Sequence, residues 1–203
     1  MIVVLSGPTG VGKSTVGERL IERNNDFVRS ISATTRAPRG GEVDGRDYHF
    51  YEDARFREEV ARGWFLEHAE VHGKLYGTPL KPAVDALRAR KAVLMIIDVD
   101  GGAQVRDLDL DALLVFLMPP SRDSLVARLS ARGTEGGADI KKRLERVDRE
   151  LAAGIKYDLA IVNDNLNDCV LSVEKAIHDA RERLAKREVV GAGLYKGLKK
   201  LGL

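Results

Sequence analysis

Residues 7–14 read GPTGVGKS, which fits the spacing G-x-x-x-x-G-K-[ST] and follows an apolar run from Ile2 to Leu5. Glycines at this spacing let the backbone turn sharply and point successive N–H groups inward, and the start of a following helix adds its positive end. Lys13 could then reach terminal phosphates, and Ser14 could ligate magnesium. The pattern predicts a nucleotide phosphate site, or P-loop, with a ligand-free glycine turn as the alternative.

Composition narrows the class of protein. The 203 residues suffice for one well-cored α/β domain. The 33 basic and 31 acidic residues nearly cancel, so we expect no nucleic acid and no membrane as partners, and affinity for anions must be local. Neither a signal peptide nor a long apolar span is recognisable, which predicts a soluble, cytoplasmic protein.

Cysteine and histidine give no sign of disulfide or metal chemistry. The single cysteine, Cys169, cannot form an internal disulfide and is expected to be a small buried core residue. Only His68 and His72 are four residues apart, and none of the four histidines has cysteine partners, so we expect structural or surface roles for them. They are His49, His68, His72 and His178.

The order of apolar runs and helical patterns predicts an α/β fold built on a doubly wound, five-stranded parallel sheet. The expected buried strands are Ile2–Leu5, Val28–Ile31, Val93–Ile97, Leu113–Leu117 and Leu159–Val162. The expected helices are 13–24, 82–90, one that Ser121 caps and that carries Leu125 and Leu129, and a last one with a stripe of Val170, Val173, Ile177, Ala180 and Leu184. Ligands are then expected at the carboxyl ends of the strands.

Two stretches are too elaborate for plain crossovers. Ser32 to Thr78 is rich in arginines, glycines and aromatics, with short strand patterns at Tyr48–Tyr51 and Phe65–Val71. Further on, arginines flank the segment GTEGGAD, whose glycines suit a hinge in a mobile lid. Arg128 and Arg132 are four residues apart and share one helix face, where they could present two guanidinium groups to phosphates or simply be solvated.

Residues 32–50 read SATTRAPRGGEVDGRDYHF, and residues 65–78 read FLEHAEVHGKLYGT. These ordered motifs resemble those of guanylate kinases. Further matches are RLSARGTE from Arg128, the arginine at Arg143, and IVNDNL from Ile161, so the resemblance reaches from residue 1 to about residue 185. It implies a P-loop kinase that catalyses ATP + GMP ⇌ ADP + GDP with Mg²⁺, and that carries an inserted GMP-binding region and a helical lid.

The resemblance also implies which residues bind GMP. They are Ser32, Arg36, Arg39, Tyr48, Glu67, Tyr76, Thr78 and Asp98. Guanidinium groups match phosphate oxygens bidentately, and phenols add directional donors. The guanine edge offers two neighbouring donors that suit the carboxylate of Glu67, while its O6 accepts from a hydroxyl such as Ser32. From the sequence alone, Glu67 would instead be a solvated charge in a strand.

On the donor side, the implied ATP-binding residues are Gly7, Pro8, Thr9, Gly10, Val11, Gly12, Lys13, Ser14, Thr15 and Asn163. The implied catalytic residues are Lys13, Arg36, Arg128, Arg132 and Arg143, and the implied magnesium ligands are Ser14 and Asp98. The attacking group is already an anionic phosphate oxygen, so catalysis needs alignment and charge neutralisation, not a strong base. An asparagine at position 163 could equally cap or turn the chain.

Three positions depart from the family pattern. Ile96 stands where the family usually has an acid two residues before the matched Asp98. Asp100 stands where a glutamine is common, and it either compensates locally or faces solvent. Leu75 stands where many relatives have a tyrosine. These changes leave the phosphate chemistry intact and bear on the affinity for GMP.

We expect one guanylate-kinase-like domain over residues 1–203. Its core is 1–31, 80–125 and 157–187, its GMP-binding insert 32–79, its lid 126–156 and its C-terminal tail 188–203. The tail is either a basic amphipathic helix for a partner or a membrane surface, or a frayed or docked terminus. ATP and GMP are the expected partners, dGMP is a further candidate acceptor, and the oligomeric state is open.

Two other functions compete with this one. A small kinase acting on a ribose bisphosphate would share the fold and the P-loop, but Glu67 and residues 34–39 (TTRAPR, the TTR-x-PR segment) disfavour it. A binding module without catalysis would typically have a degraded P-loop, whereas Lys13 and Ser14 are both present.

Overall fold

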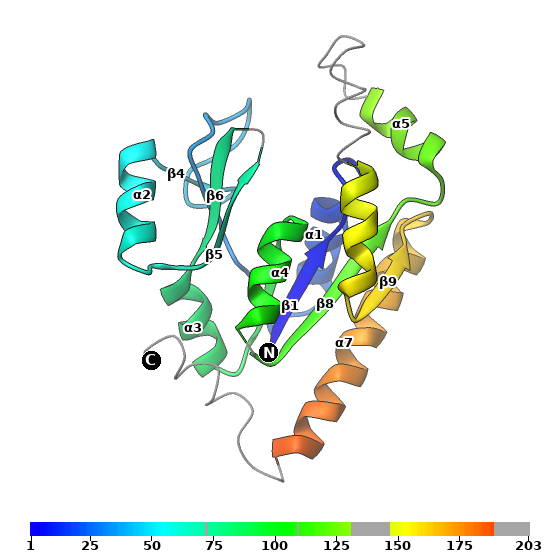
Figure 1. Cartoon of the computed structure of the whole chain (residues 1–203). Helices are drawn as coiled ribbons and strands as arrows, with labels where there is room; N and C mark the ends of the chain where they lie inside the picture. Colours follow the sequence, from blue (N-terminus) through cyan, green and yellow to red (C-terminus); the bar gives the residue numbers. More distant parts are fainter. Residues whose placement is uncertain (72, 109, 131–146, 189–203) are drawn as a thin grey trace.

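The computed structural model describes residues 1–71, 73–108, 110–130 and 147–188, and a five-stranded parallel sheet lies at its centre (Figure 1). Its strands run in the order β2-β7-β1-β8-β9. They are β1 (Ile2–Ser6), β2 (Phe27–Arg29), β7 (Ala92–Ile96), β8 (Ala112–Met118) and β9 (Leu159–Val162). The sheet expected from the apolar runs is therefore confirmed, with strand ends shifted by at most two residues.

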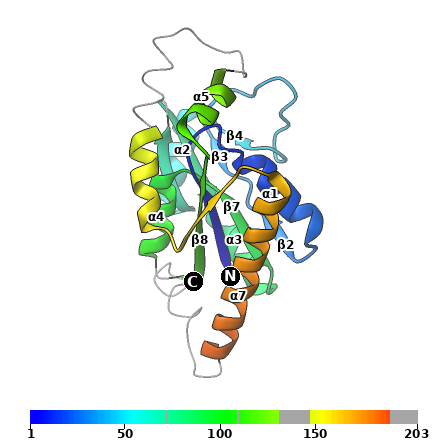
Figure 2. The ribbon, with the colours of Figure 1, turned by 90° about the vertical axis from the view of Figure 1, so that its right-hand side faces the viewer.

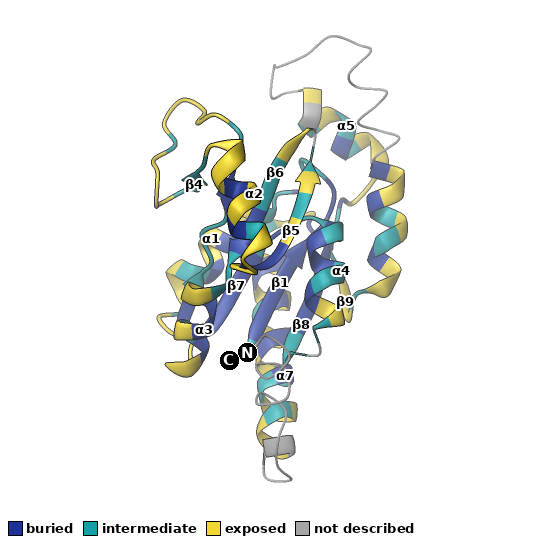
Figure 3. Cartoon of the chain, turned by 60° about the vertical axis from the view of Figure 1, so that its left-hand side comes forward, coloured by how far each residue is buried: buried dark blue, intermediate teal, exposed yellow. Residues whose placement is uncertain are grey.

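Helices cover both faces of this sheet. On one face, α1 (Lys13–Arg23) and α7 (Leu166–Glu188) pack against Val3 and Leu5. On the other, α3 (Leu80–Arg88) and α4 (Val99–Asp107) pack against Ile2 and Val4. Successive β1 side chains point to opposite faces, which explains why all five residues of this strand are buried. Figures 2 and 3 show α1 and α7 opposite α4, and the buried centre of the sheet.

The last helix matches its prediction, and the last strand does not. Val170, Val173, Ile177 and Ala180 of the stripe on α7 are buried in the core, whereas Leu184 is half-buried. Cys169 is 1% exposed in the same core, as expected. β9, however, is not a buried strand, because Leu159 is 38% and Val162 51% exposed. Within the described sheet β9 pairs only with β8, so it is an edge strand.

A second, four-stranded sheet lies beside the first, with the order β4-β3-β6-β5 (Figure 1, upper left). It contains β3 (Ala33–Thr34), β4 (His49–Phe50), β5 (Phe65–Val71) and β6 (Lys74–Pro79), and α2 (Asp53–Ala61) covers it. Phe56 of α2 stacks on Phe65 with ring centroids 4.6 Å apart, which gives this sheet a small core of its own. The strand patterns at β4 and β5 were expected, whereas β3, β6 and α2 were not.

The remaining described elements lie between β8 and β9 in the sequence. α5 (Arg122–Ser130) begins after Ser121, whose Oγ accepts a hydrogen bond from the N–H of Ser124 at 3.1 Å, so the predicted cap is confirmed. Residues 147–153 are helical and lead into the 3₁₀ turn η1 (Gly154–Lys156). Arg132, Arg143, the segment GTEGGAD, His72 and the tail from residue 189 lie outside the described residues. None of the described helices has the length and apolar character needed to cross a membrane.

Candidate functional site

The P-loop connects the carboxyl end of β1 to the start of α1. Gly12 occupies the N-cap position with φ 101°, a conformation that favours glycine, and no side chain caps this helix end in the described structure. The first N–H groups of α1 therefore remain available for an anion. Lys13 Nζ donates to the carbonyls of Gly7 at 2.6 Å and Pro8 at 3.2 Å, so the ammonium lies folded over the loop.

Asn163 ties the P-loop to the end of β9. Its side chain is buried, and Nδ2 donates to the carbonyl of Val11 at 2.7 Å. Arg128 of α5 donates to the carbonyl of Asn163 at 3.1 Å and reaches Val11 at 3.4 Å. A Cβ at Gly12 would lie 2.6 Å from Asn163 Nδ2, so the tether needs glycine there. Asn163 thus has a structural role, and its predicted contact with adenine stays a prediction.

A cavity of about 250 Å³ brings the P-loop and the second sheet together. The P-loop contributes Thr9, Lys13 and Ser14. Predicted GMP-binding residues on the same cavity are Ser32, Arg39, Tyr48, Glu67, Tyr76 and Asp98. Residues from segments far apart in the sequence therefore meet at the carboxyl ends of β1 and β7, where an α/β fold is expected to bind ligands.

Glu67 is a buried carboxyl group, only 4% exposed, on β5. Thr78 Oγ1, on the neighbouring strand β6, donates to Glu67 Oε1 at 2.6 Å. Burial, and secondarily the charge of Asp98, raises the pKa of Glu67 to about 7, although the hydrogen bond from Thr78 opposes this. The solvated charge expected from the sequence alone is therefore wrong, and the carboxyl group borders a cavity as the resemblance implies.

A second cavity of about 210 Å³ adjoins the first, and its lining includes the predicted GMP-binding residues Arg36, Arg39, Tyr48 and Tyr76. The other lining residues are Ser14, Arg29 and the acidic Glu18, Glu42 and Asp47. Arg36 makes two hydrogen bonds to Glu42, both 2.9 Å long. This pair holds the pKa of Glu42 below its ordinary value. The Tyr48 ring lies 5.3 Å from the guanidinium carbon of Arg36 and 6.1 Å from the Tyr76 ring. Cations and phenols are thus gathered in a polar pocket suited to a phosphate.

Asp98 follows β7 and caps α4, because its Oδ1 accepts the N–H of Gly101 at 2.9 Å. Asp98 and Ser14 line the same cavity, and their oxygens are the ligand type that Mg²⁺ prefers. No group of three or more His, Cys, Asp or Glu side chains in the described parts of the chain could hold a metal. These two residues therefore fit Mg²⁺ only in the way usual for kinases, with nucleotide phosphates and water as the other ligands.

Two of the three departures from the family pattern have a local role. Ile96 packs against Gly17 of α1, where an added Cβ would clash with its side chain. Asp100 accepts two hydrogen bonds from Arg149, at 3.0 and 3.2 Å, so it is part of an exposed ion pair. Asp100 therefore does not replace the missing acid in the cavity.

The sequence did not indicate the role of Glu150. This residue is 3% exposed, lines the larger cavity, and accepts a hydrogen bond from the N–H of Thr9 at 3.3 Å. It comes from the helical residues 147–153, and no motif marks it. Its position depends on where that helix packs, which local sequence cannot reveal.

The chain resembles guanylate kinases in sequence over most of its length. The profile of the family described as guanylate kinase matches residues 1–180. A guanylate kinase of Nocardia farcinica is 53% identical over 167 residues, which cover 81% of this chain and 86% of the relative. One of Clostridium perfringens is 41% identical over 174 residues, covering 86% of this chain and 81% of the relative.

A solved structure agrees with the sequence comparisons. The crystal structure of guanylate kinase from Anaplasma phagocytophilum superposes with a TM-score of 0.74 at 31% sequence identity. The superposition covers 88% of this chain and 85% of the other. The likeness therefore extends over most of both chains.

Proposed function

Because the chain belongs to the guanylate kinase family, we propose that the donor nucleotide on the P-loop and the acceptor nucleotide meet in the larger cavity, and that the adjoining smaller cavity holds the phosphate of the acceptor. The enzyme transfers the γ-phosphoryl group of ATP to GMP and yields ADP and GDP. One observation supports this arrangement of the two nucleotides. Lys13 and Ser14 of the P-loop line the same cavity as Glu67 and Tyr76 of the second sheet.

On the donor side, the N–H groups of residues 7–15 bind the phosphates of ATP at the positive end of α1. Lys13 leaves the carbonyls that it contacts without ligand and follows the transferring phosphoryl group. Ser14 and Asp98 hold Mg²⁺, which spreads the negative charge of the phosphate oxygens when it is bound. Asn163 keeps Val11 in place, and its amide oxygen faces the adenine.

On the acceptor side, Arg36, Arg39, Tyr48 and Tyr76 bind the phosphate of GMP. The carboxylate of Glu67 accepts the two neighbouring N–H donors of guanine, and Ser32 and Thr78 add hydroxyl contacts. Adenine lacks this donor pair and would leave the buried carboxylate of Glu67 without a partner. Discrimination of about 10²-fold or more follows, as for other sites that leave buried polar groups unpaired.

Catalysis then comes from alignment and cations. The attacking oxygen of GMP is already anionic, so no side chain needs to remove a proton. Lys13 and Arg36 neutralise charge, and the lid arginines Arg128, Arg132 and Arg143 complete the cationic environment and exclude water. None of the proposed contacts involves the 2′-hydroxyl group of the ribose, so dGMP is also an acceptor. We place the reaction in the cytoplasm, where both nucleotides occur.

A coupled assay of ADP production tests the acceptor. With ATP and Mg²⁺, we expect turnover with GMP and dGMP and at least 100-fold lower kcat/KM with AMP and UMP, on the order expected for an unpaired buried carboxylate. Comparable use of AMP and GMP would contradict the role given to Glu67. Activity on a ribose bisphosphate, without activity on GMP, would replace the acceptor altogether.

The variant Lys13→Met tests the phosphoryl-transfer role. Removal of one preorganised cation should lower kcat by about 10²-fold or more. The melting temperature should change little, because the hydrogen bonds from Nζ to Gly7 and Pro8 are local to the loop. A folded variant with near-normal turnover would show that Lys13 has no part in the chemistry.

A further inference from the structure

The smaller cavity contains an arginine that no motif indicates. Besides Arg36 and Arg39, its lining includes Arg29 from β2, together with Ser14 of the P-loop. Arg29 precedes the TTR-x-PR segment, and its backbone pairs with Leu94 in the central sheet. Strand β2 therefore brings a third guanidinium group to the pocket from a different sheet.

Arg36 already has several partners in this structure. Its guanidinium group donates twice to Glu42 and once to the carbonyl of Ala37, at 2.6 Å. The contact with Glu42, followed by a hydrogen bond to Tyr76, raises the pKa of Arg36, although burial opposes the rise. Much of the donor capacity of Arg36 is therefore used inside the protein.

The guanidinium groups of Arg29 and Arg39 differ from that of Arg36. In the parts of the chain that the structure describes, neither makes a side-chain hydrogen bond or an ion pair. Arg29 still acts electrostatically on the pocket. The pKa of Tyr48 is raised, first by burial, and Arg29 is one of the charges that oppose this rise. Glu18 and Asp47 also line this cavity, and Arg29 contributes to the lowered pKa of Asp47, after hydrogen bonds from Val43 and Arg46. Two cations whose guanidinium donors are not used in described hydrogen bonds thus face the same polar cavity.

We propose that Arg29 binds the phosphate of the acceptor nucleotide together with Arg39, as a contact beyond the two arginines of the TTR-x-PR segment. The inference rests on the proposed function of this site. A phosphate monoester at neutral pH carries close to two negative charges and three acceptor oxygens. Arg29 and Arg39 supply two guanidinium groups for it, while Glu42 holds Arg36 beside them. Because Ser14 lines the same cavity, a phosphate bound there is next to the donor loop.

The test compares GMP with guanosine, which lacks the phosphate. Calorimetry without ATP should show that Arg29→Gln weakens GMP binding about tenfold or more, the usual size for a charge-assisted hydrogen bond. Guanosine binding should not change. In the kinase assay, KM for GMP should rise while kcat stays within about threefold, since the same contact is present in the ground and transition states. Unchanged GMP affinity, or equal losses for GMP and guanosine, would overturn the proposal.

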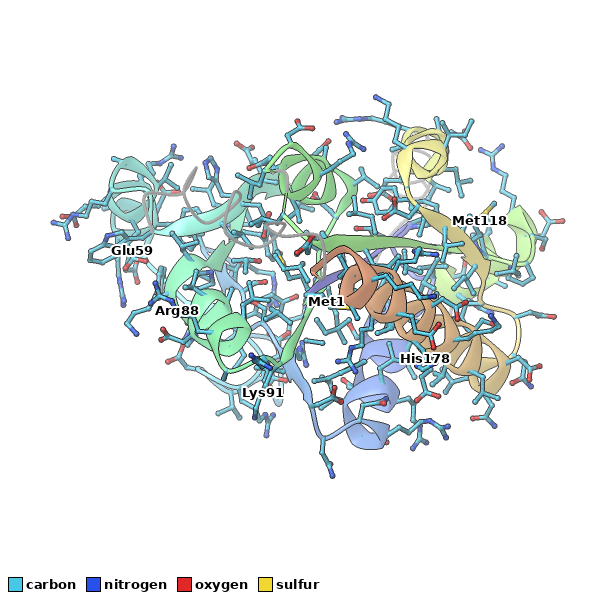
Figure 4. All side chains as sticks on the ribbon, turned by 90° about the horizontal axis from the view of Figure 1, so that it is seen from below. Met1, Glu59, Arg88, Lys91, Met118 and His178 are labelled. Atoms are coloured by element: carbon cyan, nitrogen blue, oxygen red, sulfur yellow. The ribbon has the colours of Figure 1, made fainter. Side chains whose placement is uncertain are left out.

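Arg88→Gln is the matched control. Arg88 is an exposed arginine on α3, and Figure 4 shows it on the surface in the view from below. It lies four residues before β7 starts, and so near the amino end of the sheet, opposite the site. The same charge change there should leave both affinities unaltered. If Arg88→Gln loses as much GMP affinity as Arg29→Gln, the loss comes from the change in net charge. That result would overturn the proposed contact between Arg29 and the phosphate.

A second measurement does not depend on how the glutamine variant folds. The Nε–H resonance of Arg29, assigned by its loss in Arg29→Lys, should shift when GMP is added to the unmodified protein and not when guanosine is added. An Nε–H chemical shift of Arg29 that does not change when GMP is added would overturn the proposal. Failure of the unmodified protein to bind GMP would overturn the proposed function itself. If GMP binds tightly and the Arg29 resonance does not change, only the proposed contact of Arg29 with the phosphate is wrong.

Discussion

Glu67 makes the affinity for GMP depend on pH. Its carboxyl group is buried and its pKa is raised to about 7, first by burial. Guanine needs the ionised form, because both of its neighbouring groups are donors. As the pH falls from 8 to 6, the ionised fraction should fall from about 0.9 to about 0.1, so KM for GMP should rise about tenfold. Steady-state kinetics over this range measure the change.

Glu67→Gln separates this effect from titration of the substrate. The phosphate of GMP itself titrates near pH 6, which changes its affinity for arginines in both proteins. The glutamine variant should bind GMP more weakly at pH 8 and retain only the substrate's titration. KM values for ATP should stay equal in the two proteins. Parallel pH profiles for GMP would mean that Glu67 is not the titrating group.

At the residue scale, the sequence could predict positions that belong to a motif. Lys13, Ser14, Glu67 and Tyr76 were named from their spacing and resemblance, and the structure brings all four to one cavity. Arg29 belongs to no local pattern and is near the acceptor pocket only through the pairing of β2 with β7. Roles of individual residues in binding and catalysis stay predictions until variants are measured.

At the scale of elements, the close packing of α4 on β5 depends on Gly101. A Cβ at this position would overlap Glu67 Oε2. Gly101→Ala should therefore displace the Glu67 side chain and raise KM for GMP about tenfold or more, as when a charge-assisted hydrogen bond is lost. KM for ATP should change little, because the P-loop is untouched. Kinetics with each nucleotide varied in turn provide the measurement.

The stability of the Gly101→Ala variant provides a second test of this packing. Alanine in a helix interior is ordinarily favoured over glycine by up to about 1 kcal/mol. If the contact with Glu67 is as tight as the structure indicates, Gly101→Ala should instead lower the free energy of unfolding in urea. A stabilised variant with normal KM for GMP would show that α4 has room to accept the methyl group.

A helix or strand could be predicted from the sequence where a single apolar run marks it. The five strands of the central sheet consist of such runs, with neighbours set by the crossover rules. β3 and β4 have two residues each, too few for a periodic signal, although an alternating pattern around β4 was visible. α4 contains two adjacent glycines and has poor helix propensity, and it is stabilised by its Asp98 cap and its packing.

At the scale of the whole molecule, the sequence predicted the fold class. The order of the strands in the sheet and the packing between distant segments were harder to predict. The order β2-β7-β1-β8-β9 places β9 at an edge, which no run of apolar residues reveals. The second sheet forms its own core, in which Phe56 and Phe65 pack with Ala33 from an earlier part of the insert. The proposed boundaries of the insert, the lid and the tail stay predictions, since much of the lid and the tail lie outside the described residues.

Cys169 can report opening of the whole molecule. It is the chain's single cysteine, it is 1% exposed in the core between α7 and the central sheet, and burial raises its pKa to about 11. Both features suppress reaction of the thiol with a disulfide reagent in the folded state. Labelling at pH 8 should therefore be slow and should follow global unfolding, with a rate proportional to the open population when closing is fast.

Ligand linkage gives this labelling a quantitative test. GMP binds only the folded protein, so at 100 times its Kd it should stabilise the fold by about 2.7 kcal/mol and slow labelling about 100-fold. The same GMP concentration should protect Glu67→Gln less. A Cys169→Ala protein with a surface thiol from Ser172→Cys should label fast with or without GMP, because Ser172 is exposed on α7. Labelling of Cys169 that GMP does not slow would mean that α7 opens locally, and that the core beneath it is independent of the nucleotide site.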